Sequence, residues 1–208
     1  MASTDLYAGL TRAVRRPARP RPPLADVVAR RGPEGYAVFS QCGRFRYELV
    51  RWLGTGGRLG PTVRFVLLNP STADEHVLDP TLRRCADFAR RWGYGEMVVH
   101  NLFAFRSTSP QAMAEAAREG QDVVGPGNDL WISQCSAELT VVGWGAHRIA
   151  RDRAAAVLGM LGTVSCLGCT SDGSPRHPLY LPRHALPTPY RQPVPAGTGA
   201  AVQGGTQR

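Results

Sequence analysis

The fold is decided by residues 63–108, which read VRFVLLNPSTADEHVLDPTLRRCADFARRWGYGEMVVHNLFAFRST. The stretch begins with a short apolar run that stops at Asn69-Pro70. Such a run, bounded by an Asn-Pro pair, is typical of a buried strand that ends in a turn. A helix should begin after Asp79, because this side chain can cap the first turn and Pro80 suits the first helical position.

Leu82, Cys85, Phe88 and Ala89 recur at helical spacing, and Gly93 then ends the predicted helix. Residues 96–100 predict a second strand. A strand, a crossover helix and a strand within about 40 residues form a βαβ unit, in which the two strands must be parallel. The loops after both strands therefore meet at the carboxyl edge of the sheet, where open α/β sheets bind their ligands.

The segments on either side extend this architecture. Residues 110–119 and 127–136 predict helices, residues 139–142 and 164–167 predict two further buried strands, and a long helix is expected between those strands. Residues 36–40 and 45–53 predict an antiparallel hairpin, in which Phe45, Tyr47 and Leu49 alternate against Arg46 and Glu48. We therefore expect an α/β fold of three layers, with a four-stranded parallel sheet between helices and the hairpin at one edge.

Length and composition favour one domain with two tails. With 208 residues, 43% of them hydrophobic, the chain can bury one substantial core. We expect a basic, Arg- and Pro-rich flexible arm in residues 1–33, the α/β domain in residues 34–182 and a disordered Pro- and Gly-rich tail in residues 183–208. The sequence shows no long apolar run and no amino-terminal signal peptide, which predicts a cytoplasmic protein without membrane contact.

The net charge of +9 is concentrated in the tails. Residues 1–31 contain seven arginines and two aspartates, whereas residues 32–182 contain fifteen arginines and fourteen acidic residues. The tails could bind a polyanion as flexible arms or act only as solubilising segments. The chain contains no lysine, so covalent catalysis by a lysine amine is excluded. The five scattered cysteines indicate reduced thiols. Cys166 and Cys169 have the spacing of a metal or redox pair, but no second pair completes a zinc site, so we expect structural thiols and no metal or other cofactor.

Polar residues gather where the predicted strands end. Asn69 and its neighbours follow the first strand and either position a ligand or cap their own turn. Asn101, Phe103 and Arg106 follow the second strand, and an aromatic plane beside a guanidinium is a recurrent way to hold a nucleotide. Arginines in the intervening helix either bind substrate or form its solvated face. The candidate substrate-binding residues are Pro70, Ser71, Thr72, Asp79, Arg83, Arg84, Asn101, Phe103, Arg106, Asn128 and Arg176.

Seven separate motifs resemble a family of bacterial and phage proteins, the domain of unknown function numbered 1643. They are FVLLNPSTAD (65–74), DPTLRRC (79–85), WGYG (92–95), NLFAFRST (101–108), VGPGND (124–129), GWG (143–145) and GSPRHPLYL (173–181). The resemblance extends over about residues 36–181, which is the whole expected domain. It implies a shared fold and no particular reaction.

A more distant likeness is to the uracil-DNA glycosylase superfamily, whose sheet also has four parallel strands between helices. In that superfamily an asparagine or aspartate after the first strand positions a water molecule, and a late His-Pro-Ser loop contacts the sugar. Asn69-Pro70-Ser71 resembles the first motif, and His177-Pro178-Leu179 resembles the second, with leucine in place of serine. The resemblance implies that Asn69 and His177 are catalytic residues.

The leading hypothesis is a metal-independent hydrolase that cleaves the N-glycosidic bond of a base in nucleic acid or in a nucleoside. Asn69 would orient water, and His177 would stabilise the departing base or the cationic sugar. Two alternatives stay open, a noncatalytic module that binds nucleotides or nucleic acid, and an enzyme that acts on a free modified nucleotide. In each case the expected partner is a nucleic acid or a nucleotide.

Overall fold

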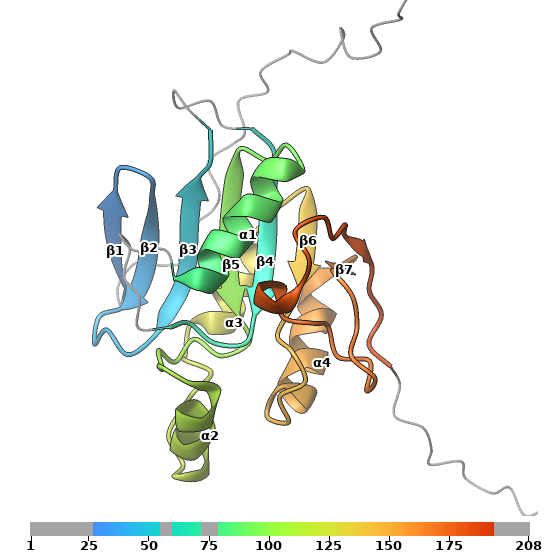
Figure 1. The fold of residues 1–208 in the computed structure, drawn as a ribbon. Helices are drawn as coiled ribbons and strands as arrows, with labels where there is room; N and C mark the ends of the chain where they lie inside the picture. Colours follow the sequence, from blue (N-terminus) through green and yellow to red (C-terminus); the bar gives the residue numbers. More distant parts are fainter. Residues whose placement is uncertain (1–26, 55–59, 72–78, 194–208) are drawn as a thin grey trace, which may run out of the picture.

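The computed structural model describes residues 27–54, 60–71 and 79–193 and shows an α/β fold built on one eight-stranded mixed sheet (Figure 1). The strand order is β1-β2-β3-β5-β4-β6-β7-β8. The strands are β1 (Val27–Gly32), β2 (Gly35–Ser40), β3 (Arg46–Trp52), β4 (Thr62–Leu67), β5 (Glu96–Asn101), β6 (Leu139–Val142), β7 (Ser165–Cys166) and β8 (Thr188–Pro189). The helices are α1 (Pro80–Arg91), α2 (Pro110–Arg118), α3 (Asn128–Gln134), α4 (Ala150–Leu161) and the 3-10 turn η3 (Pro178–Tyr180).

The middle of the sheet is parallel and both of its sides are antiparallel. β4 pairs in parallel with β5 and β6, and β6 pairs in parallel with β7. β3 pairs antiparallel with β5, which joins the strands β1, β2 and β3 to the same sheet, and β8 closes the other side antiparallel to β7. The α/β class is confirmed. The predicted four-stranded parallel sheet with a hairpin at one edge is not confirmed as such, because β2 and β3, which form that hairpin, belong to one eight-stranded mixed sheet.

Helices cover the two faces of this sheet (Figure 1). The apolar stripe of α1, which includes Leu82, Cys85 and Phe88, packs with alternate residues of β4 and β5 in one core cluster. Val66 of β4 points to the other face and packs with α2, α3 and α4 in a second cluster. β4 is buried along its whole length, as its continuous apolar run predicted.

The start of α1 follows from its capping residues. The carboxylate Oδ1 of Asp79 accepts the backbone N–H of Leu82 at 2.8 Å, and Pro80 occupies the first helical position, where no N–H is needed. Arg90 and Arg91 lie in the last turn, where positive charge is favourable to the helix dipole. The predicted helix and its cap are therefore present in the structure.

Two parts of the sheet come from segments that the sequence assigned to the tails. β1 pairs with β2 along its length although it falls within the predicted arm, and β8 falls within the predicted tail. β1 is an edge strand whose side chains are mostly exposed, so it has no apolar pattern by which sequence could reveal it. Residues 1–26 and 194–208 of the predicted arm and tail lie outside the described residues.

A β-bulge in β3 changes the direction of one important side chain. Val38 pairs with Glu48 and Phe39 pairs with Arg46, so the register shifts between Val38 and Phe39 and β3 contains one extra residue at this point. Opposed residues of an antiparallel pair lie on the same face, and Phe39 belongs to the cluster under α1 whereas Val38 belongs to a cluster with α3. The bulge therefore turns Arg46 and Glu48 to opposite faces. The predicted alternation, which placed both on one face, was wrong.

Among residues 27–54, 60–71 and 79–193, no helix is both long enough and apolar enough to cross a lipid bilayer.

Candidate functional site

A cavity of about 700 Å³ lies at the carboxyl edge of the parallel strands. Asn69 after β4, Asn101 at the end of β5, Trp144 after β6 and His177 after β7 all line it. β5 and β6 lie on opposite sides of β4, so the chain reverses its direction across the sheet at β4. This reversal opens a crevice at the strand ends, which is where α/β sheets bind ligands.

The cavity brings together six of the residues predicted from sequence. They are Asn69, Ser71, Asp79, Asn101, Arg176 and His177. Thr72 lies outside the residues that the structure describes. The other predicted residues, Pro70, Arg83, Arg84, Phe103, Arg106 and Asn128, do not line this cavity.

Asn69 is held between two loops. Its side-chain nitrogen Nδ2 donates to the carbonyl oxygens of Pro70, at 3.2 Å, and Ser107, at 3.4 Å. The backbone N–H of Ser107 donates in turn to the carbonyl of Pro70, so the loop after β4 is tied to the segment that follows β5. With Nδ2 engaged in this way, the carbonyl oxygen Oδ1 is the atom of the Asn69 amide suited to accept a hydrogen bond from a ligand or a water.

Asp79 joins the cavity to the start of α1. Its Oδ1 caps the helix through Leu82, and its Oδ2 accepts the hydroxyl of Ser71 at 2.6 Å. Asp79 is also the carboxylate whose charge acts on both Arg46 and His177. Among the described residues, Asp79 is therefore the acidic side chain of the cavity, and its charge acts on at least two basic side chains.

His177 precedes the 3-10 turn η3 and is half-buried. Its Nδ1 accepts the backbone N–H of Leu179 at 3.4 Å, so the neutral ring carries its proton on Nε2. Burial lowers the pKa of His177 from its ordinary value of 6.5, and the negative charge of Asp79 partly opposes this effect. At neutral pH the ring is therefore an uncharged donor at the cavity. Tyr180, which is 81% exposed, lies beside it at the rim, with the two ring centroids 5.7 Å apart.

This lowered pKa predicts how His177 affects stability. At pH values between the pKa of His177 in the folded state and 6.5, its pKa in the unfolded chain, the unfolded chain binds the proton more tightly. The free energy of unfolding therefore decreases as pH falls through this range. Below this range both states are protonated and the difference is constant. We expect urea unfolding curves of His177→Gln to show a smaller loss of stability on acidification than wild type. An equal loss in both proteins would contradict the lowered pKa.

Arg46 is a buried cavity residue that sequence reasoning missed. Its side chain lines the cavity although the residue is only 3% exposed. Within the described part of the chain, neither Nε nor Nη1 has a hydrogen-bond partner. Burial lowers the pKa of Arg46 to about 10. The positive charges of Arg106 and Arg51 lower this pKa further, whereas the negative charge of Asp79 raises it. The group is still charged at neutral pH, so the cavity contains a buried guanidinium with unused donors.

The remaining predicted residues have structural positions. Phe103 is buried in the core cluster under α4, and the Nδ2 of Asn128 donates to the carbonyls of Asn101 and Leu102 at 3.1 and 3.0 Å. Arg106 donates from Nη1 to the carbonyl of Gly43 and stacks over the ring of Phe39, and it lines a separate shallow depression. The prediction that Arg106 would share the cavity with Asn69 was therefore wrong.

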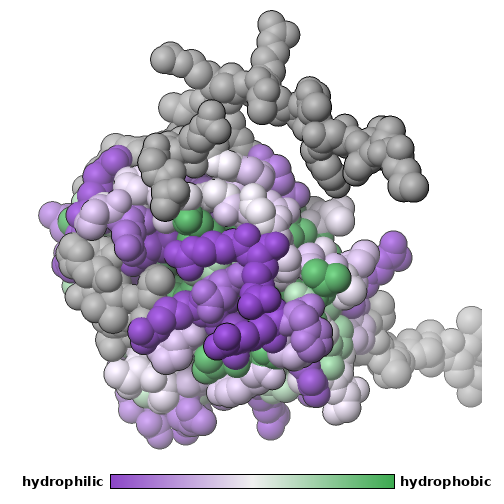
Figure 2. Space-filling view, turned by 45° about the horizontal axis from the view of Figure 1, so that its top comes forward, coloured by the Kyte–Doolittle hydropathy of each residue, from purple (hydrophilic) through white to green (hydrophobic). Residues whose placement is uncertain are grey.

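Arg83 and Arg84 lie on the outward side of α1, exposed and half-buried respectively. Figure 2 shows hydrophilic residues gathered across the side of the molecule that carries this helix. This arrangement agrees with the solvated-face interpretation of these arginines. Other cavity residues also escaped the sequence prediction, among them Trp144, His147 and Thr170, of which Trp144 is part of the Gly-Trp-Gly motif.

No curated protein and no solved structure matches this chain. The family described as "Protein of unknown function (DUF1643)" matches residues 46–179, which is more than half of the chain. The matched segment begins at Arg46 and includes Asn69, Asp79 and His177, so it contains every described cavity residue except Tyr180. The chain belongs to the DUF1643 family.

Proposed function

We propose that the cavity binds a nucleotide and that the protein hydrolyses the N-glycosidic bond of that nucleotide. The observation that carries the proposal is the buried guanidinium of Arg46, whose Nε and Nη1 have no partner in the described residues, in one cavity with Asn69, Asp79 and His177. A cavity of about 700 Å³ falls within the usual range of small-molecule sites, and a nucleotide is a ligand of that scale.

Arg46 favours an anionic ligand. A buried cation with unsatisfied donors is costly, and a phosphate or carboxylate that entered the cavity would supply both charge and acceptors for Nε and Nη1. Arg176 also lines the cavity, so two guanidinium groups are available for the same anion. Because Arg46 is almost completely buried, its ligand has to enter the cavity, which favours the phosphate of a free nucleotide over the surface phosphates of a duplex.

The polar residues of the cavity could perform the hydrolysis without a covalent intermediate. Oδ1 of Asn69 would accept one hydrogen of a water molecule, and Asp79 would receive the proton that the water releases, through Ser71 or directly. The water oxygen would bond to the anomeric carbon as the bond between that carbon and the base nitrogen breaks. Nε2–H of His177 would donate to the departing base, which takes the electron pair.

The motif likeness to the uracil-DNA glycosylase superfamily supports this assignment of roles. Asn69-Pro70 and His177-Pro178 come from distant parts of the sequence, and both of the matched polar side chains line one cavity. The likeness rests on these motifs, since no solved structure matches the chain.

The direct test is to incubate the purified protein with nucleosides, with the corresponding nucleoside monophosphates, and with oligonucleotides that contain modified bases, and to detect free base by mass spectrometry. We expect base to be released from phosphorylated substrates in preference to unphosphorylated nucleosides. Binding of a nucleoside monophosphate without release of base would favour the noncatalytic alternative. Absence of both binding and release across the panel would contradict the proposal.

Deletion of the basic amino-terminal segment tests whether the partner is a nucleic acid or a free nucleotide. Removing residues 1–26 takes away five arginines and two aspartates and leaves β1 intact. We expect this deletion to lower affinity for oligonucleotides and to flatten its dependence on salt, because fewer counterions are released, while affinity for a nucleoside monophosphate stays unchanged. Fluorescence anisotropy over a range of salt concentrations measures both. An unchanged salt slope would assign the phosphate contacts to the α/β domain.

A further inference from the structure

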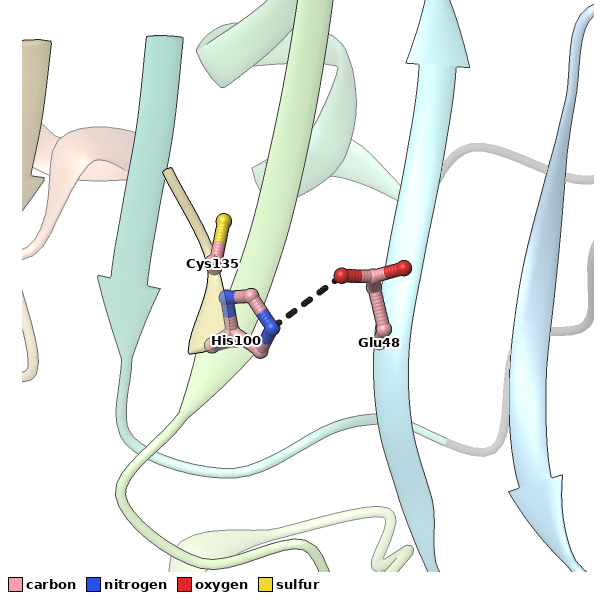
Figure 3. A group of neighbouring side chains, drawn as sticks. All are labelled: Glu48, His100 and Cys135. Carbon is pink, nitrogen blue, oxygen red and sulfur yellow. Dashed lines mark ion pairs between the residues drawn. The ribbon is translucent and has the colours of Figure 1, made fainter. Parts of the chain in front are cut away.

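A second cluster of reactive side chains lies on the other side of the sheet from Arg46. Glu48 of β3, His100 of β5 and Cys135, which follows α3, converge there (Figure 3). Each offers one ligand atom, and these atoms all lie within 4.8 Å of one another. His100 is 0% exposed, Glu48 is also buried and Cys135 is half-buried.

Each of the three residues is positioned by a different structural feature. The bulge in β3 directs Glu48 to the side of α3, and the hydroxyl of Tyr36 donates to its Oε1 at 3.0 Å. His100 pairs in register with Val66 in the middle of the sheet. The carbonyl of Cys135 accepts from Nη1 of Arg64 at 3.2 Å, which fixes the end of α3. Anchors of this kind around the ligands are usual at metal sites.

We propose that Glu48, His100 and Cys135 bind a divalent transition-metal ion of the zinc type. Zinc takes sulfur at about 2.3 Å and nitrogen or oxygen at about 2.0 to 2.2 Å, so ligand atoms of a tetrahedral centre lie roughly 3.3 to 3.8 Å apart. Nε2 of His100 and Oε2 of Glu48 are already 3.4 Å apart (Figure 3). The ligand atoms of the three residues lie within 4.8 Å of one another, so closure to these separations requires a movement of about 1 Å at most, which a side-chain rotation can supply.

The chemistry of the three donors selects the kind of ion. Thiolate and imidazole are ligands of zinc and its neighbours, whereas calcium and magnesium prefer oxygen alone. The carboxylate of Glu48 and the thiolate of Cys135 together balance the two positive charges of the ion, so the ion can be buried without a net charge. The half-buried position of Cys135 provides the route of entry and leaves the fourth coordination position for water.

The bound ion would stabilise the fold, because its ligands join β3, β5 and the end of α3, and it lies apart from the cavity of Asn69. None of its three ligands lines that cavity. Metal binding should therefore raise the melting temperature, since an ion that binds only the folded state stabilises it. It should leave the affinity of the cavity for phosphate unchanged.

The test is a titration of the chelator-treated full chain with Co²⁺, which reports thiolate ligands by charge-transfer absorption in the near ultraviolet, and with Zn²⁺ followed by calorimetry. We expect uptake of one ion per chain and a higher melting temperature. Cys135→Ser should abolish the absorption band and weaken Zn²⁺ binding by more than the roughly 10- to 100-fold that loss of an outer-shell partner costs. Glu48→Gln should weaken binding while retaining the band.

Cys169→Ser is the matched control, because the thiol of Cys169 lies 3.7 Å from that of Cys166 and this pair is the rival thiol site. It should bind Co²⁺ like the wild type. Loss of the band in Cys169→Ser with retention in Cys135→Ser would overturn the proposal, and so would absence of uptake by the wild type. Circular dichroism shows that each variant is folded, and Cys135 suits the test because it is only half-buried.

Discussion

Replacing Arg46 with methionine is expected to stabilise the protein and to abolish binding of an anion in the cavity. Methionine has a similar length and fills the same space, but it removes a buried charge whose Nε and Nη1 have no partner in the described residues. Replacement of buried charges by apolar residues of similar volume is often neutral or stabilising by about 1–4 kcal/mol. Loss of the guanidinium should weaken the binding free energy of the anion by about 2–4 kcal/mol, which raises its dissociation constant roughly 30- to 1,000-fold.

Arg64→Met is the matched control for this prediction. Arg64 is equally buried, but its guanidinium donates to Oγ1 of Thr140 and to the carbonyls of Ile132 and Cys135. Removal of the Arg64 guanidinium leaves these buried acceptors unsatisfied, so we expect the free energy of unfolding to fall by about 2–4 kcal/mol. Binding of the anion in the cavity should be retained. Urea unfolding measures the first effect, and calorimetric titration with inorganic phosphate and with nucleoside monophosphates measures the second. Arg46 would be a structural residue if Arg46→Met lost stability like Arg64→Met and still bound these anions.

Arg46 also shows where sequence reasoning fails. The pattern from Phe45 to Leu49 alternates between apolar and polar residues, which predicts a half-exposed strand with arginine in solvent. In the structure α1 and the cavity cover one face of β3 and α3 covers the other, so both polar residues are buried. The bulge that separates Arg46 from Glu48 depends on the pairing with β2, and a single strand's sequence carries no signal of it.

The elements of the fold that could be predicted are determined by their own local sequence. The apolar run of β4 and the Asp-Pro cap of α1 each determine their own element, and the βαβ connection then forces parallel strands. Residues directly after those strands, Asn69 and Asn101, had to reach the carboxyl edge together. Residues further along these loops, such as Arg106, do not have to lie at the carboxyl edge. Arg106 turns toward Gly43 and Phe39, because the loop after β5 bends toward the antiparallel part of the sheet, which the sequence predicted as a hairpin at one edge without its position relative to this loop.

The cluster of Glu48, His100 and Cys135 could not be predicted for a different reason. The three residues come from segments that are far apart in the sequence, so no ligand spacing exists to be recognised. Their proximity depends on the order of β3 and β5 in the sheet and on the position of α3 across one face.

Asn69→Ala and His177→Ala are expected to reduce turnover by roughly a hundredfold or more each, because loss of a group that positions water or stabilises the leaving base costs a few kcal/mol in the transition state. Stability should change little. The amide of Asn69 makes two long hydrogen bonds, to Pro70 and Ser107, and loss of a turn-capping residue costs about 1 kcal/mol. His177 is half-buried and makes one long hydrogen bond, to the N–H of Leu179.

Two control variants separate catalysis from structure in this experiment. His184 is exposed and does not line the cavity, so His184→Ala should leave both melting temperature and turnover unchanged. Asn128 resembles Asn69 in donating from Nδ2 to two carbonyls, but it is completely buried, so Asn128→Ala should lower stability by a few kcal/mol. If Asn69→Ala lost as much stability as Asn128→Ala, or if it retained full turnover, Asn69-Pro70-Ser71 would be a structural turn. In that case the chemistry of the cavity would depend on Asp79, with Arg46 limited to binding.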